Sequence, residues 1–349
     1  LVLTTLIFAP ATFASDGESS IAEAPVGWDV SAPNYSARAQ EIGLSVDQGT
    51  WMNLDVSPDG KRIAFDLLGD IYEIPIEGGE ASPLLSGHAW EVQPQYSPDG
   101  RFLAFTSDRD GADNIWAMEI ANPENKQQIT HERFRLLNNP TWHPSGHYLA
   151  AKKHFTTSRS LGTGEIWLYD ARLAQSLERT HLQGSVLVEK PTPSFQKELG
   201  EPTFSADGRS VFFIQNTTPG NTFIYHEDSN GEVMAIKRYD LETGEIEKVV
   251  GGAGGAVRPT PSPDGKSLAF VKRVRAASRL FVLNLESGEQ TMLVDDLDPD
   301  MQETWAVQGA YPTMAWMPDG KTIIYWSKGE NLARQRRLRS HKKHPVLGQ

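Results

Sequence analysis

The sequence predicts an all-β protein, a six-bladed β-propeller whose sixth blade is incomplete. A phrase of nine or ten residues recurs six times, and the segment after each copy alternates apolar and polar residues in short runs. Successive copies start 40 to 62 residues apart, a spacing that suits four-stranded blades with some long loops. The copies begin at Ser57, Ser97, His143, Ser205, Ser262 and Met317.

The repeated phrase, Ser57-PDGKRIAF in its first copy, has the chemistry of a tight turn followed by a strand. Proline presets φ at the first corner, aspartate caps the turn, and glycine takes the conformation that other residues resist. We therefore expect each phrase to join an inner strand to the next strand outward. Third strands are predicted to begin near Asp70, Asn114, Glu165, Glu232 and Arg279, and weaker fourth strands near Ser82, Gln128 and Glu245.

Composition restricts the partners of the chain. The formal net charge of -12 argues against a nucleic-acid partner, which would need a clustered positive surface. Beyond residues 1–14, no segment approaches the roughly 20 apolar residues that a membrane span requires. With no cysteine, the 349 residues have neither a disulfide framework nor a thiolate metal site. We expect neither nucleic acid nor a membrane span.

The first 47 residues divide into two parts. Residues 1–14 form an apolar run that ends in small residues, typical of the remnant of a secretory signal with cleavage after Ala14. A short buried strand is the alternative. Residues 15–47 include Glu41-IGLSVD, a candidate strand for closing the ring. We therefore predict an exported, periplasmic protein with its propeller at residues 48–327.

Residues 328–349 change the character of the chain abruptly, with seven Lys or Arg and one acidic residue. They stand where an apolar third strand of the sixth unit is due. One interpretation is a basic tail for nucleic acid or a membrane surface. The other, which we favour, is a shifted reading frame, because a peptide read one base later can supply the missing strand. We expect this aberrant tail to be disordered and the natural product to continue beyond it.

The repeats resemble those of TolB-like (WD40-like, PD40) propellers, through the Ser-Pro-Asp-Gly phrases and the segment Thr106-SDRDG. Longer phrases, including Gly87-HAWEVQPQYSPDG and Lys153-HFTTSRSLGTGEIWLYD, resemble the N-terminal propeller of exported bacterial proteins that fuse such a propeller to an amidohydrolase domain. The resemblance implies that this chain supports or gates a hydrolase domain. A divalent metal cofactor would then belong to that domain and not to this chain.

No catalytic or metal centre is predicted in these residues. His143 and His147 are separated by a turn and cannot share a helix face. Asp108, Asp110 and Asp113 have the spacing of calcium donors, but the downstream glutamate is missing, so a polar hairpin turn is favoured. The sequence also has no Gly-x-Ser-x-Gly nucleophile motif. We expect no catalytic residues, no metal ligands and no cofactor.

Candidate binding residues lie on the loops that precede the inner strands, because these loops converge on one mouth of a propeller channel. Aromatic and charged side chains there suit a peptide or a partner protein domain. Packing between blades is the alternative, and so is a pair between Arg258 and Glu201 across the channel. The candidates are Trp51, His88, Trp90, Arg135, Asn139, Glu198, Glu201, Arg258, Gln302, Glu303, Trp305 and Tyr311. On a separate loop, Lys153, His154 and Arg159 are candidates for an anionic group or for a solvated loop.

Three functions fit these expectations. The first is a non-catalytic propeller that supports or gates an amidohydrolase domain encoded beyond this chain. The second is a stand-alone TolB-like adaptor that binds proteins in the periplasm. The third is the propeller gate of a serine peptidase.

Overall fold

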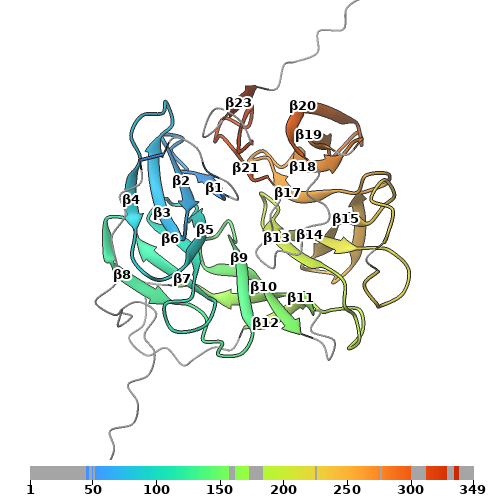
Figure 1. Ribbon diagram of the computed structural model, residues 1–349, viewed down its shortest axis with the longest axis horizontal. Helices are drawn as coiled ribbons and strands as arrows, with labels where there is room; N and C mark the ends of the chain where they lie inside the picture. Colours follow the sequence, from blue (N-terminus) through green and yellow to red (C-terminus); the bar gives the residue numbers. More distant parts are fainter. Residues whose placement is uncertain are drawn as a thin grey trace, which may run out of the picture.

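A ring of β-sheets makes up the molecule (Figure 1). The computed structural model describes residues 45–46, 49, 52–156, 162–172, 184–224, 226–275, 277–299, 312–327 and 334–337. These residues form strands, turns and bends, and no helix occurs among them. The sheets follow one another around the ring in chain order, each with its first strand toward the centre. The predicted all-β propeller is confirmed.

Five sheets have four antiparallel strands each. The first contains β1 (Leu54–Val56), β2 (Arg62–Leu67), β3 (Asp70–Pro75) and β4 (Ser82–Leu85). The second contains β5 (Glu91–Tyr96), β6 (Phe102–Ser107), β7 (Asn114–Glu119) and β8 (Asn122–Gln128). The third contains β9 (Leu136–Trp142), β10 (Tyr148–Thr156), β11 (Gly162–Asp170) and β12 (Ser185–Val188). The fourth contains β13 (Leu199–Phe204), β14 (Ser210–Asn216), β15 (Met234–Asp240) and β16 (Ile246–Val250). The fifth contains β17 (Val257–Pro261), β18 (Ser267–Arg273), β19 (Ala277–Asn284) and β20 (Gln290–Pro299).

The sixth unit differs from the other five. It forms a three-stranded sheet of β21 (Met314–Trp316), β22 (Thr322–Tyr325) and β23 (Arg334–Arg337). The predicted blade count of six is not confirmed, because five blades are complete. Four residues of the basic tail, β23, occupy the place where an apolar third strand was expected. The signal remnant at residues 1–14 and residues 41–44 and 47 of the expected closing strand lie outside the described part of the chain, and residues 45–46 are not in a strand.

The repeated phrase forms the turn between the first two strands of each blade, as predicted. In the first copy Ser57 Oγ donates to Asp59 at 2.7 Å and accepts the Arg62 N–H at 3.0 Å. Gly60 lies at φ 71°, a conformation that glycine takes without a steric penalty, and its N–H donates to the Ser57 carbonyl. The same serine–aspartate bond recurs at Ser97, Ser205 and Ser262.

Neighbouring sheets pack face to face through buried apolar side chains, and the sixth sheet packs on both of its neighbours. Its Ile324 and Trp326 share a cluster with Phe65 of the first blade. Its Trp316 and Tyr325 share another with the fifth blade. The indole N–H of Trp316 also donates to the Thr260 carbonyl at 2.9 Å. This packing brings the last sheet against the first and surrounds a central channel.

Candidate binding site in the central channel

A β-bulge recurs at the same place on four inner strands. Two residues on β5, β9, β13 and β17 face a single residue on the second strand of the blade. The first residue of each pair has a positive φ, between 49° and 60°, and the second is proline, which has no N–H to give to the ladder. We call Gln93, Asn139, Glu201 and Arg258 the bulge residues.

The bulge residues line a cavity of about 440 Å³ in the channel. It extends toward the turns of the repeated phrase, whose prolines Pro58, Pro98, Pro144 and Pro263 also line it. Its lining includes the aromatic residues Tyr96, Trp142, Phe204 and Trp316. Asn53 and Thr313 complete the polar ring from the first and sixth sheets. The cavity therefore combines apolar walls with a polar ring, as ligand pockets commonly do.

Hydrogen bonds connect the ring from blade to blade. Each of three bulge residues donates its N–H to a side chain of the preceding blade. Gln93 donates to Asp66 at 2.7 Å, and Asn139 donates to the Gln93 amide oxygen at 2.7 Å. Arg258 donates to Glu201 Oε2 at 2.8 Å. Because the bulges interrupt the sheet ladder, these N–H groups are available to fix the inner strands to one another.

Arg258 extends across the channel. Its Nε lies 3.4 Å from Glu201 Oε1, and its Nη2 lies 3.4 Å from Asn53 Oδ1. It thereby connects the fourth, fifth and first blades. Arg258 is thus part of the polar ring at the level of the bulges.

Burial raises the pKa of three carboxyl groups at this level. The pKa of Asp55 rises to about 7 and that of Asp66 to about 6, although backbone N–H donors favour the ionised form of both. The pKa of Glu201 is also raised by burial, and Arg258 works in the opposite direction. Of the three, Asp55 and Glu201 line the cavity, and ionisable groups with perturbed pKa values in a cavity are typical of functional sites.

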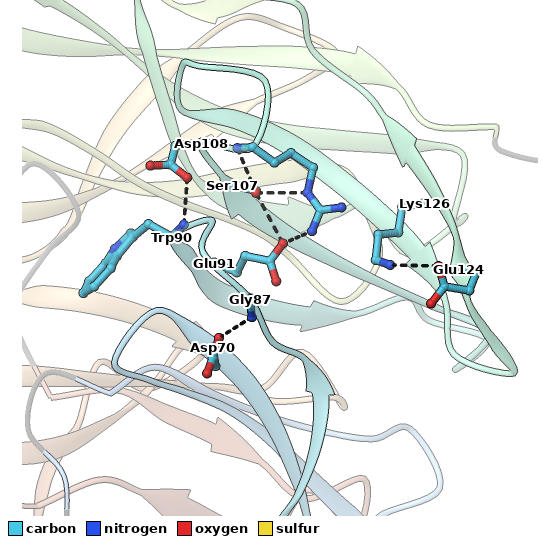
Figure 2. A network of polar contacts seen from close by, with 9 residues as sticks. Asp70, Gly87, Trp90, Glu91, Ser107, Asp108, Glu124 and Lys126 are labelled. Atoms are coloured by element: carbon cyan, nitrogen blue, oxygen red, sulfur yellow. Dashed lines mark hydrogen bonds and ion pairs between the residues drawn. The ribbon is translucent and has the colours of Figure 1, made fainter. Parts of the chain in front are cut away.

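The loops at the opposite mouth hold His88 and Trp90, which do not line the cavity. The backbone N–H of Trp90 donates to the Asp108 carboxylate at 2.7 Å, and Trp90 is 47% exposed (Figure 2). Beneath it Glu91 pairs with Arg109, whose guanidinium lies 5.1 Å from the centre of the Trp116 ring. Asp108, one of the three aspartates with the spacing of calcium donors, therefore accepts a hydrogen bond from the loop that holds Trp90. Asp110 of the same pattern accepts from Asn114.

Lys153 and His154, expected on an anion-binding loop, lie on β10, and the side chains around them make several cation–aromatic contacts. Phe155 has Lys190 Nζ 4.2 Å and the Arg135 guanidinium 4.6 Å from its ring centre. Lys153 lies 4.0 Å from the Trp167 ring and pairs with Glu132. Burial and the charges of Lys152 and Arg135 lower the pKa of His154 to about 4, so His154 is neutral at pH 7. Most charge in this cluster is compensated within it.

The structure separates the sequence-predicted residues into three groups. Asn139, Glu201 and Arg258 come together in the channel, and the expected Arg258–Glu201 pair is present. His88, Trp90 and Arg135 lie on loops away from the cavity, and Glu198 pairs with the buried Lys152. The third group lies outside the described residues and comprises Trp51, Arg159, Gln302, Glu303, Trp305 and Tyr311.

Sequence reasoning missed Asn53, Asp55, Asp66 and Gln93. A signal was present for Gln93, because a polar residue followed by proline stands four residues before four of the repeated phrases. Asp55 and Asp66 have no such signal, since alternation alone does not show that a carboxyl group is buried. The burial of these two carboxyl groups depends on packing against the neighbouring blade, which the residues of their own strands do not show.

Within the described ranges, no group of three or more His, Asp or Glu side chains is arranged to hold a metal ion. No helix long and apolar enough to cross a membrane is found in that part of the chain.

No protein-family model matches the chain. Among curated proteins it is 26% identical over 191 residues to the uncharacterized peptidase YuxL of Bacillus subtilis. The matched region covers 46% of this chain and 29% of that relative. It is 23% identical over 255 residues to dipeptidyl aminopeptidase BIII of Pseudoxanthomonas mexicana, and this match covers 65% of the present chain and 36% of the relative. An uncharacterized protein of Agrobacterium fabrum, Atu1656, is 38% identical over 68 residues, covering 18% and 23%. The matches thus span between about a quarter and a third of these relatives.

Solved structures show the fold. A putative TolB from Agrobacterium tumefaciens superposes with a TM-score of 0.57 at 18% identity, covering 82% of this chain and 90% of that one. TolB from Acinetobacter baumannii gives 0.54 at 15% identity, covering 82% and 63%. The tricorn protease gives 0.53 at 16% identity, covering 84% and 27%. The chain has the fold of TolB-like propellers, and these identities show the fold alone.

Proposed function

We propose that this chain is a non-catalytic propeller domain that binds a peptide-like ligand in its central cavity and serves a hydrolase domain of a larger, exported protein. The observation that carries the proposal is the cavity of about 440 Å³, with aromatic and proline walls and a polar ring. Asn53, Gln93 and Asn139 of that ring have carboxamide side chains, which donate and accept hydrogen bonds. Such a lining suits the alternating N–H and C=O groups of an extended peptide.

The hydrolase domain is proposed to be of the amidohydrolase type, because the longest non-repeating phrases resemble that class of fusion protein. A serine-peptidase domain is the second candidate, favoured by the matches to two relatives named as peptidases. Both chemistries cleave amide bonds, and both therefore fit a peptide-like ligand in the propeller. A periplasmic location and a full ring of six blades belong to the same proposal.

A stand-alone adaptor is the third candidate, favoured by the putative TolB structure, 90% of which this chain covers. An adaptor that recognises the surface of a folded protein would not need the cavity. A variant with a blocked cavity therefore distinguishes peptide binding in the cavity from binding to the surface of a folded protein.

Titration calorimetry of the full chain with the tetrapeptide Ala-Ala-Phe-Ala tests peptide binding. Thr203→Trp places a large side chain in the cavity, and Glu245→Trp places the same residue on an exposed turn of the same blade. We expect Thr203→Trp to weaken binding at least about tenfold, equivalent to about 1.4 kcal/mol. Glu245→Trp is expected to bind as the wild type does. Equal binding by both variants would contradict the proposal.

A further inference from the structure

We infer that the central cavity recognises its ligand through a primary ammonium group, with Asp55 as the counter-ion. The inference rests on the proposed function, since it names the chemistry of the ligand that the same cavity binds. The ammonium group can be the amino terminus of a peptide or a lysine side chain. The argument starts from the charges of the cavity lining.

Three charged side chains line the cavity, Asp55, Glu201 and Arg258. Glu201 and Arg258 neutralise each other, with Nε and Oε1 3.4 Å apart and a further bond from the Arg258 N–H. Asp55 has no ion pair among the described residues. With all three groups ionised, the lining therefore carries one negative charge, and Asp55 holds it.

The Asp55 carboxylate is held in place by backbone donors. Its Oδ1 accepts the Val56 N–H at 2.9 Å, and its Oδ2 accepts the Tyr96 N–H of the next blade at 2.8 Å. Each carboxylate oxygen has lone pairs to accept further bonds, and an ammonium group has three donors. A ligand cation can therefore bind Asp55 without displacing either backbone bond.

The energetics also favour a cation over a neutral or anionic ligand. Burial raises the pKa of Asp55 to about 7, which means that its ionisation is disfavoured in the empty cavity. A cation beside the carboxylate offsets that cost, as opposite charges within a few ångströms do.

The test compares three probes by titration calorimetry with the full chain near pH 7, where α-amines are largely protonated. The probes are Ala-Ala-Phe-Ala, its N-acetylated form, and N-acetyl-Lys-Ala-Phe-Ala. We expect the free amine to bind at least about tenfold more tightly than the N-acetylated alanine peptide. The lysine probe shows whether a side-chain ammonium substitutes for the terminal one. Tighter binding of either ammonium probe supports the inference.

Two carboxyl variants locate the counter-ion. Asp55→Asn is expected to abolish the preference for the ammonium, while Glu247→Gln, at an exposed carboxylate outside the cavity lining, is expected to keep it. Gln95→Lys, which tethers an ammonium to another lining position, is a second test that leaves the bonds of Asp55 intact. We expect it to abolish the preference as well.

The outcomes separate the two proposals. Equal affinities for all three probes in the wild type would overturn the ammonium inference and leave peptide binding standing. No binding of any probe would overturn both. A preference that survives in Asp55→Asn and in Gln95→Lys would contradict the assignment of Asp55.

Discussion

Arg258 contacts Glu201 on the neighbouring inner strand through both its backbone and its side chain. The Arg258 N–H donates to Oε2 at 2.8 Å, and Nε lies 3.4 Å from Oε1. The positive φ of Arg258, 57°, belongs to the bulge that presents this N–H to the neighbouring blade. One buried carboxylate therefore connects two blades and neutralises the charge of Arg258 in the channel.

Removal of Glu201 is predicted to destabilise the protein. Glu201→Ala leaves the Arg258 charge buried without its partner, and we expect a loss of about 3 kcal/mol in the free energy of unfolding, measured by urea denaturation. Glu201→Gln keeps an acceptor for the Arg258 N–H and should cost less. The control is Glu247→Ala, in an exposed pair with Arg238, with an expected loss of less than about 1 kcal/mol. Equal losses for Glu201→Ala and Glu247→Ala would refute this view of the pair.

The indole of Trp316 is predicted to join the sixth sheet to the fifth. Trp316→Phe removes the N–H that donates to the Thr260 carbonyl at 2.9 Å. We expect a loss of about 1 to 2 kcal/mol in the free energy of unfolding, from the bond and from the smaller ring. Trp90→Phe, at a half-exposed ring, is the control and should change stability by less than about 0.5 kcal/mol. An unchanged free energy of unfolding in Trp316→Phe would mean that this contact does not stabilise the ring of sheets.

Close packing of two blades is predicted to make Gly164 irreplaceable. A Cβ at this position would lie 2.0 Å from the Leu199 carbonyl oxygen on the next blade, and 2.8 Å from the buried Lys152 side chain. Gly164→Ala should therefore prevent normal docking of the third and fourth blades, seen as a large fall in melting temperature. Gly78 has φ 88° and open space around it, so Gly78→Ala should lower the free energy of unfolding only by the penalty for an alanine in the left-handed conformation, about 1 to 2 kcal/mol. A milder effect at Gly164 than at Gly78 would show that the blades separate easily.

The buried aspartates are predicted to make the protein less stable as the pH rises. The folded-state pKa values of Asp55 and Asp66, about 7 and about 6, lie above the ordinary value of 3.8. The folded state therefore binds more protons than the unfolded state between these limits, so ionisation favours unfolding. Their contribution is most favourable below pH 4 and is lost as the pH rises toward 7.

The measurement is the free energy of unfolding of the wild type minus that of the Asp55→Asn/Asp66→Asn double variant, from pH 4 to 8. We expect this difference to fall by up to about 6 kcal/mol and to level off only near pH 8, because each pH unit between the unfolded and folded pKa values is worth about 1.4 kcal/mol. A flat difference would show that neither carboxyl group is perturbed. A rising difference would show that both are stabilised as anions.

The sequence predicted the blades better than the site, for a physical reason. The Ser57 turn and its relatives depend on local chemistry, and so do the third strands that begin at Asp70 and Asn114. The fourth strand near Gln128 was misplaced, because β8 already ends there and its polar residues show no apolar run. The contact between the Arg135 guanidinium and the Phe155 ring could not be predicted, since a loop's position depends on packing that its own residues do not show.

Peptide binding in the channel is tested most directly by locating a bound peptide. Ala-Ala-Phe-Ala with benzoylphenylalanine in place of phenylalanine would be photo-crosslinked to the full chain, and the attachment sites mapped by mass spectrometry. We predict attachment to the inner strands around the cavity, at residues such as Trp142, Phe204 and Thr203, and loss of attachment in Thr203→Trp. Attachment to the outer strands, or attachment that the Thr203→Trp variant leaves unchanged, would contradict the account.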